Sequence, residues 1–158
     1  MALGALALLA ALANALRLAA WAGWRVWREP LLGVLHLGYA FIVLALAARA
    51  LFLFGLLANP SLWYHALGVG AMGTLIVGVM TRVSVGHTGR PLQLLPGAIA
   101  IYFAIIAAAV LRLATASGML PYTTGLLFSA LAWAAGLLLF GVLYGPLLLR
   151  PRPDGKPG

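Results

Sequence analysis

Residues 63–91 read WYHALGVGAMGTLIVGVMTRVSVGHTGRP. The stretch begins with aromatic residues of the kind found at membrane interfaces, continues through a glycine-rich apolar run, and closes with a short polar segment. Between Ala66 and Gly78, small residues recur at every fourth position, a pattern that lets two helices approach closely. The stretch therefore predicts a membrane-spanning helix packed tightly on its neighbours, followed by a polar loop from Arg82 to Pro91.

The composition of the whole chain indicates that lipid is its main solvent. Of 158 residues, 65% are hydrophobic and 8% are charged, and the mean hydropathy is +1.09. So few charges cannot cover a water-exposed surface, which excludes an ordinary soluble domain. The net charge of +8 does not indicate nucleic-acid binding, because the basic residues stand singly or in pairs at the ends of apolar runs.

The residue types that are missing narrow the chemistry. The chain has no cysteine, which excludes disulfides, cysteine-ligated zinc, iron–sulfur clusters and covalently attached haem. Glu29 and Asp154 are its only acids, which disfavours paired-carboxylate catalysis and proton relays through buried acids. A bound metal would therefore use histidine, methionine, carboxylate or backbone ligands.

The apolar runs predict an all-α fold, a polytopic transmembrane helix bundle of about five spans. Each run approaches or exceeds the roughly 20 residues needed to cross the hydrocarbon layer. The triplet Ala13-Asn14-Ala15 resembles a signal-peptidase site, but no basic segment precedes the first run, so a transmembrane span is preferred to a cleaved signal peptide. The expected spans are residues 1–20, 31–57, 62–81, 94–116 and 123–149, followed by a basic cytoplasmic tail at 150–158.

Charged residues in the expected loops orient the bundle. Because cytoplasmic loops carry the excess of arginine and lysine, the N-terminus is expected outside the cytoplasm and the C-terminus inside it. Tryptophans interleaved with arginines at residues 21–28 are interpreted as an interfacial belt on the inner side. The basic residues that alternating spans would place on that side are Arg25, Arg28, Arg82, Arg90, Arg150, Arg152 and Lys156.

Three histidines are the candidate metal ligands: His36 and His87 near the inner side, and His65 near the outer side. Imidazole is the one ligand for haem iron or copper that this chain supplies repeatedly. About 25–30 Å separates the two levels at the rise of an α-helix, so one metal cannot take both His36 and His65. The alternative interpretation is that each histidine lies at the interface and hydrogen-bonds to water or a carbonyl group.

Four arginines are candidates for binding the carboxylates of a cofactor. Arg82 and Arg90 lie on either side of His87 in the sequence. They could pair with haem propionates or with anionic lipid headgroups. Arg49 and Arg112 lie deeper on the outer side, away from both acids. Propionates near the outer face would supply their partners, and so would snorkelling to lipid phosphate.

Three stretches resemble the NnrS family: LHLGYAFI at 35–42, HALGVGAMGTLIVGVMTRVSVGHTGRP at 65–91 and PRPDGKPG at 151–158. Weaker similarity extends over essentially the whole chain. The resemblance implies a polytopic protein of the bacterial inner membrane, associated with nitric oxide and denitrification, that contains copper and non-covalent b-type haem.

The resemblance also carries expectations about particular residues and partners. It implies that His36, His65 and His87 are the family's histidines, with Arg82 and Arg90 as supporting residues. Family members are much longer, and this chain resembles their C-terminal part. A truncated or half-size protein is therefore expected, which associates with itself as a homo-oligomer or with a separate N-terminal half.

Three functions remain open at this point. The first is a haem- and copper-binding membrane protein of nitric oxide metabolism or nitrosative-stress response, with nitric oxide as a ligand that is either turned over or only bound. The second is a non-catalytic assembly module in which the histidines are interface residues and the small residues drive helix association. The third, a small-solute transporter, is disfavoured because the runs at 94–116 and 123–149 are almost wholly apolar.

Overall fold

Helices account for the regular structure of the part of the chain that the computed structural model describes, which is residues 1–26, 28–153 and 155. Segments α3, η2 and α4 form one continuous helix, so the described residues contain five helices long and apolar enough to cross a membrane. This confirms the predicted all-α bundle of about five spans. The elements are α1 (Ala2–Ala20), the 3₁₀ turn η1 (Gly23–Arg25), α2 (Pro30–Leu53), α3 (Ser61–His65), the π-helix η2 (Ala66–Met72), α4 (Gly73–His87), α5 (Ile99–Ala116) and α6 (Tyr122–Leu149).

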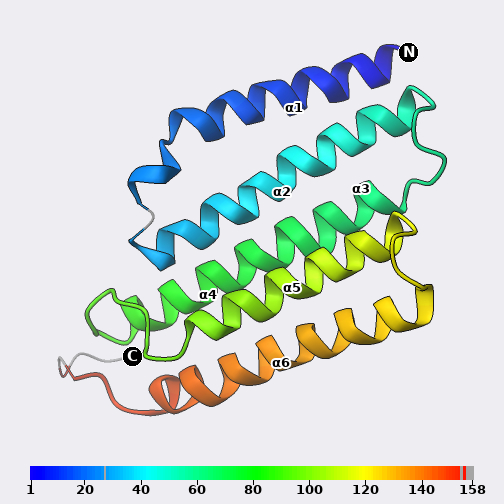
Figure 1. Ribbon diagram of the computed structural model, residues 1–158. Helices are drawn as coiled ribbons and strands as arrows, with labels where there is room; N and C mark the ends of the chain where they lie inside the picture. Colours follow the sequence, from blue (N-terminus) through cyan, green and yellow to red (C-terminus); the bar gives the residue numbers. More distant parts are fainter. Residues whose placement is uncertain (27, 154, 156–158) are drawn as a thin grey trace.

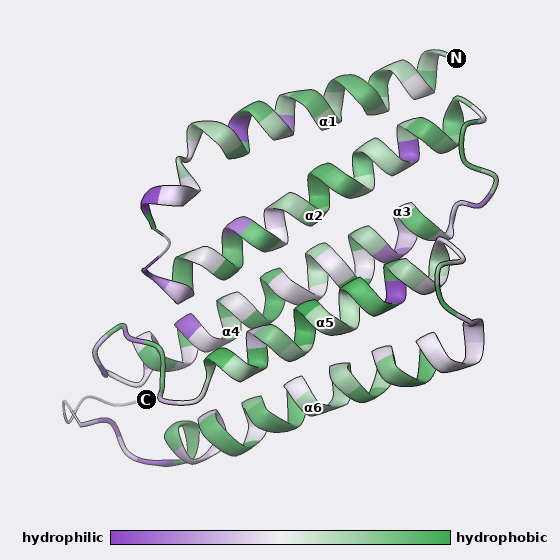
Figure 2. Cartoon of the chain, in the orientation of Figure 1, coloured by the Kyte–Doolittle hydropathy of each residue, from purple (hydrophilic) through white to green (hydrophobic). Residues whose placement is uncertain are grey.

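The five spans lie side by side in chain order (Figure 1). Helix α1 packs on α2, α2 packs on the third span, and the third span packs on α5 and α6. Hydrophobic residues cover most of each helix, and hydrophilic residues gather toward the helix ends (Figure 2). We name the end that carries residues 21–26, 88–98 and 150–153 the basic end, and the end that carries the turns 54–60 and 117–121 the opposite end.

Local sequence explains where the helices begin and end. Pro30 is the first residue of α2, a position where the missing N–H group removes no helical hydrogen bond. Helix α2 ends before Gly55, whose φ of 76° is left-handed, and the Leu56 amide donates back to the Leu51 carbonyl at 2.9 Å. Helix α5 ends in the same way before Gly118, whose φ is 80°.

Helix α4 extends beyond the end that the sequence predicted. A helix ending near Thr81 was expected, whereas the helix continues to His87. The Thr88 hydroxyl donates to the Ser84 carbonyl at 2.7 Å, so this polar side chain is satisfied by the helix itself. The polar residues therefore do not require a loop until Thr88.

Small residues bring the third span close to α2, as the spacing predicted. A Cβ added at Gly78 would lie 2.9 Å from a methyl carbon of Val34, and one added at Gly38 would lie 2.7 Å from the Leu75 side chain. Ala66, at the start of the same stripe, is fully buried. The small-residue stripe is thus used for packing within this chain.

The third span contains a π-helix at Ala66–Met72, directly after His65. In a π-helix the backbone hydrogen bonds skip one residue more than in an α-helix, which widens the turn. Immediately after it, the buried Thr74 hydroxyl has no hydrogen-bond partner within the described residues. The centre of this span therefore departs from regular α-helical geometry.

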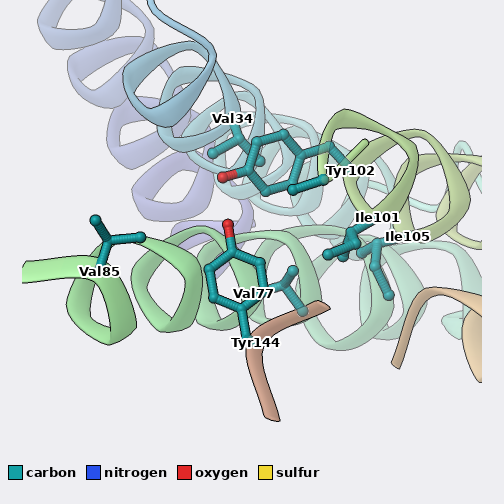
Figure 3. Packing of buried hydrophobic residues seen from close by; sticks show 8 residues of the cluster. Val34, Val77, Val85, Ile101, Tyr102, Ile105 and Tyr144 are labelled. Carbon is teal, nitrogen blue, oxygen red and sulfur yellow. The ribbon is translucent and has the colours of Figure 1, made fainter. Parts of the chain in front are cut away.

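The core lies where α2, α4, α5 and α6 meet (Figure 3). Tyr102 from α5 and Tyr144 from α6 enter it among aliphatic side chains, and both rings are almost fully buried. The Thr81 hydroxyl donates its one proton to the Gly78 carbonyl at 2.9 Å. In the contact of 2.6 Å between the Thr81 and Tyr102 hydroxyls, Tyr102 is therefore the donor. Polar groups in the interior of a bilayer require such internal partners.

Candidate functional site

His36 is the histidine whose geometry best suits a bound metal. Its Nδ1 lies 2.9 Å from the Leu32 carbonyl oxygen, which can only accept a hydrogen bond, so Nδ1 carries the proton. Nε2 therefore holds a lone pair, and it is buried with no hydrogen-bond partner in the described structure. Histidines that ligate metals have this arrangement, because a bond from the second ring nitrogen fixes the tautomer and the ring orientation.

Two apolar grooves flank the His36 ring. One, of about 450 Å³, lies between α2 and α5 and has Tyr102 and Phe103 in its wall. The other, of about 410 Å³, lies between α1 and α2 and has Leu18 in its wall. Ligand sites for apolar cofactors are typically grooves of this kind with few polar groups. The residues that line both grooves are Gly23, Trp24, His36 and Leu37.

Aromatic and polar residues of the first two spans support the His36 ring. The Trp21 ring meets the His36 ring edge-on, with centroids 5.9 Å apart, and lies 4.6 Å from the Tyr39 ring. The Tyr39 hydroxyl donates to Asn14 Oδ1 at 2.5 Å, and Asn14 Nδ2 donates to the Ala10 carbonyl at 2.8 Å. Asn14 therefore faces α2 and links α1 to the helix that carries His36.

His87 lies in a different setting, at the exposed end of α4. Arg152 donates to the His87 carbonyl through Nη1 at 3.0 Å, and Arg90 donates to the Thr88 carbonyl at 3.2 Å. A pocket of about 320 Å³ opens there, with His87, Thr88, Arg150 and Arg152 in its lining. The basic end thus presents one exposed imidazole among arginines.

His65 lies at the opposite end, on α3, where two arginines contact aromatic rings. The Arg49 guanidinium carbon lies 4.6 Å from the centroid of the Trp63 ring, and that of Arg112 lies 5.8 Å from the centroid of the Tyr122 ring. Arg112 is also within electrostatic range of His65. The negative faces of the rings act here as partners for cations that have no carboxylate nearby among the described residues.

The structure keeps the predicted site residues in separate groups. Arg49 lies about 20 Å farther along α2 than His36 at the rise of an α-helix, so one cofactor on His36 does not extend to it. Within residues 1–26, 28–153 and 155, no three histidine or acidic side chains form a group that could hold a metal ion. A haem needs one or two protein ligands and would need only the single imidazole of His36, whereas a copper site built on three histidine or acidic side chains is not formed by the described residues.

Sequence reasoning missed two residues of the His36 site. Gly23 covers the His36 ring, and Ala22 next to it has a left-handed backbone, with φ of 50° and ψ of 48°. Both lie in the tryptophan- and arginine-rich stretch that was interpreted only as an interfacial belt. A glycine within a run of bulky interfacial residues was the available signal, because it marks a place where the main chain approaches another group closely.

Five apolar helices and an imidazole in an apolar groove define a polytopic membrane protein with a candidate cofactor site. The family model described as NnrS protein matches residues 1–152, and the chain belongs to the NnrS family. The resemblance found in the sequence is therefore confirmed over essentially its whole length, and membership makes this a membrane protein related to nitric oxide. Comparisons with curated proteins and with solved structures gave no match.

Proposed function

We propose that the protein binds b-type haem through His36 and takes part in nitric oxide metabolism or the response to nitrosative stress. One observation carries this proposal: the buried Nε2 of His36 has no hydrogen-bond partner in the described structure, while Nδ1 is bound to the Leu32 carbonyl. An unpaired buried polar atom is costly in a bilayer. A metal that accepts the Nε2 lone pair would remove that cost.

The residues around His36 would have distinct roles toward the cofactor. Haem would supply an iron centre able to bind nitric oxide. The Leu32 carbonyl keeps the proton on Nδ1 and so leaves the lone pair of Nε2 for the metal. Tyr102 and Phe103 form an apolar wall that suits the face of a porphyrin and excludes water.

The remaining candidate residues are assigned to the two ends. Arg82 and Arg90 lie toward the basic end, like His36, and are the proposed partners of its haem propionates. His87 is proposed as a copper ligand at the basic end, and His65 is proposed as one at the opposite end. Their missing co-ligands would come from a second copy of the chain or from a separate N-terminal half. Arg49 and Arg112 would bind carboxylates of a cofactor held at the opposite end.

We also propose that the protein lies in the bacterial inner membrane with the basic end toward the cytoplasm. The support is the concentration of arginines in the turns at that end, which matches the positive-inside rule. This orientation places the N-terminus outside and the tail at 150–158 inside.

A second candidate, a membrane assembly module without metal, has its own support. The close approaches of Gly78 to Val34 and of Gly38 to Leu75 give the small-residue stripe a purely structural use. Under this alternative the histidines bind nothing, and association of helices is the whole function.

The decisive experiment is a visible spectrum of the detergent-purified protein, expressed with ample haem and copper, with and without nitric oxide. We expect a Soret band that shifts with nitric oxide and falls by roughly tenfold or more in His36→Ala, because the axial ligand is lost. Free imidazole in the buffer should restore the band in that variant, since it can occupy the space left by the side chain.

His65→Ala is the matched control, because His65 is the last residue of α3, which lies at the opposite end of the bundle (Figure 1). It should retain the Soret band. Retention of the full band in His36→Ala would contradict the proposed ligand. A helical but colourless wild-type protein, including after co-expression with an N-terminal half, would favour the assembly module.

A further inference from the structure

The turn after α1 lies directly on the imidazole of His36. A Cβ placed at Gly23 would lie 2.8 Å from Cδ2 and 3.5 Å from Nε2 of His36. Nε2 is buried even though grooves open on both sides of the ring. The main chain at Gly23 therefore lies against the ring edge that carries Cδ2 and Nε2, and it forms no hydrogen bond to Nε2 within the described structure.

The covering turn adopts a costly backbone conformation. Ala22 has φ of 50° and ψ of 48°, and it is the one non-glycine residue with positive φ in the described parts of the chain. A side chain with a Cβ is disfavoured in this left-handed region, because the Cβ crowds the following carbonyl oxygen. The turn is closed by hydrogen bonds from the Arg25 amide to Ala22 at 2.8 Å and from the Val26 amide to Gly23 at 3.1 Å.

The strained backbone of Ala22 and the unsatisfied Nε2 of His36 thus lie close together. Moving the turn away from the ring would relieve the backbone strain and expose Nε2 to a ligand. We propose that Ala22 and Gly23 form a displaceable cap that blocks Nε2 of His36 when closed and admits a metal-centred ligand when open. The two flanking grooves share Gly23 and Trp24, so lifting the cap joins them into one cleft with the imidazole in its wall. That the natural ligand is haem rests on the proposed function, whereas the cap does not.

The test measures access to Nε2 by chemical modification of the haem-free protein. Diethyl pyrocarbonate reacts with an imidazole nitrogen that has a free lone pair, and mass spectrometry of peptides gives separate rates for His36 and His87. His87 is exposed and serves as the reference within the same molecule. We expect His36 to react roughly tenfold more slowly than His87 in the wild type, because reaction requires the cap to open.

Two substitutions in the cap should change the His36 rate in opposite directions. Gly23→Ala places a methyl group against a ring that is held by its bond to Leu32, so the cap cannot close and the rate should approach that of His87. Ala22→Gly removes the left-handed strain, so the cap closes more firmly and the rate should fall roughly fivefold. The His87 rate should stay constant in both variants.

Gly141→Ala is the matched control, because an added Cβ there meets nothing within 4 Å. It should leave both rates unchanged, and circular dichroism should give the same helical signal for every variant. Equal reactivity of His36 and His87 in the wild type would overturn the cap. So would an unchanged His36 rate in a folded Ala22→Gly variant, which remains informative if Gly23→Ala fails to fold.

A second arm separates the cap from the identity of the ligand. Haemin is added to the wild type, to Gly23→Ala and to Ala22→Gly, and the rate at which the Soret band appears is recorded. Faster binding by Gly23→Ala and slower binding by Ala22→Gly supports both proposals. If the modification rates of His36 change as expected but no protein gives a Soret band, the proposed cap is supported and haem is not the ligand.

Discussion

Arginines within the helices and arginines in the turns are stabilised in different ways. At the opposite end, Arg49 and Arg112 lie over the faces of aromatic rings, at 4.6 and 5.8 Å from the ring centroids. At the basic end, Arg90 donates to a backbone carbonyl, that of Thr88, at 3.2 Å. Near the basic end, Arg17 also lies over an aromatic ring, at 5.6 Å from the centroid of Trp21. Arginines within helices therefore have π partners at both ends, whereas Arg90, in the turn after α4, has a main-chain partner.

The difference follows from the scarcity of acids and from depth in the membrane. The chain has only two acids among its 158 residues, so carboxylates cannot serve most of its ten basic residues. Arginines within the helices use ring faces, which supply attraction without a second charge to desolvate. Arginines in the loops are close to water, where a hydrogen bond to an accessible carbonyl is sufficient.

The largest expected difference between the ends is their location. A green fluorescent protein fused to the C-terminus should fluoresce, because the basic end is proposed to face the cytoplasm. Alkaline phosphatase inserted after Ala58, in a turn of the opposite end, should be active, because it folds only outside the cytoplasm. Exchanging the two reporters between the sites is the control and should silence both. The reverse pattern would contradict the proposed orientation.

The next largest effect is expected from removing a ring at the opposite end. Trp63→Ala should lower the free energy of unfolding by about 2 kcal/mol, because it deletes a half-buried side chain and the ring face under Arg49. Unfolding by sodium dodecyl sulfate, followed by circular dichroism, measures this change.

Trp63→Phe is the matched control for that measurement. It keeps a ring beneath Arg49 and removes the buried Trp63 Nε1, which has no hydrogen-bond partner among the described residues. We expect a loss below about 1 kcal/mol for this variant. Equal losses for the alanine and phenylalanine variants would mean that the ring face does not stabilise the arginine.

The smallest effect is expected at the basic end. Arg90→Gln should lower the free energy of unfolding by about 0.5 kcal/mol, because it removes one hydrogen bond between neighbouring residues near water. The same unfolding measurement applies, with Arg90→Lys as the variant that keeps the charge. A loss as large as that of Trp63→Ala would remove the contrast between arginines in helices and arginines in turns.

The sequence was sufficient for the architecture because the bilayer imposes it. Long apolar runs separated by charged or Pro- and Gly-containing turns predicted the five spans, and backbone hydrogen bonding in lipid allows little besides helices there. The end of α4 was placed too early, near Thr81, because polar residues were taken to mark a loop. The Thr88 hydroxyl bonds to a helix carbonyl instead, and only the structure reveals that local choice.

The His36 site was predictable only in part. The sequence singled out the three histidines because imidazole is a versatile ligand, but it could not rank them. Their ranking depends on the Leu32 bond, on the burial of Nε2 and on the approach of Gly23, and the last two are tertiary facts. The cap residue is separated from His36 by a turn and part of α2, so no periodicity within one helix connects the two.

The π-helix at Ala66–Met72 has a consequence for how this span tolerates changes in length. A π-helical turn accommodates about one residue more than the α-helical turn that it replaces. Deleting Val69 would allow the segment to become α-helical without shifting the α4 residues packed on α2. His65 would keep its direction around the helix axis, because the π-helical turn had held the surplus residue, whereas deleting a residue from α4 would turn His65 by about 100°. The middle of the span can thus lose one residue without redirecting the histidine at its end.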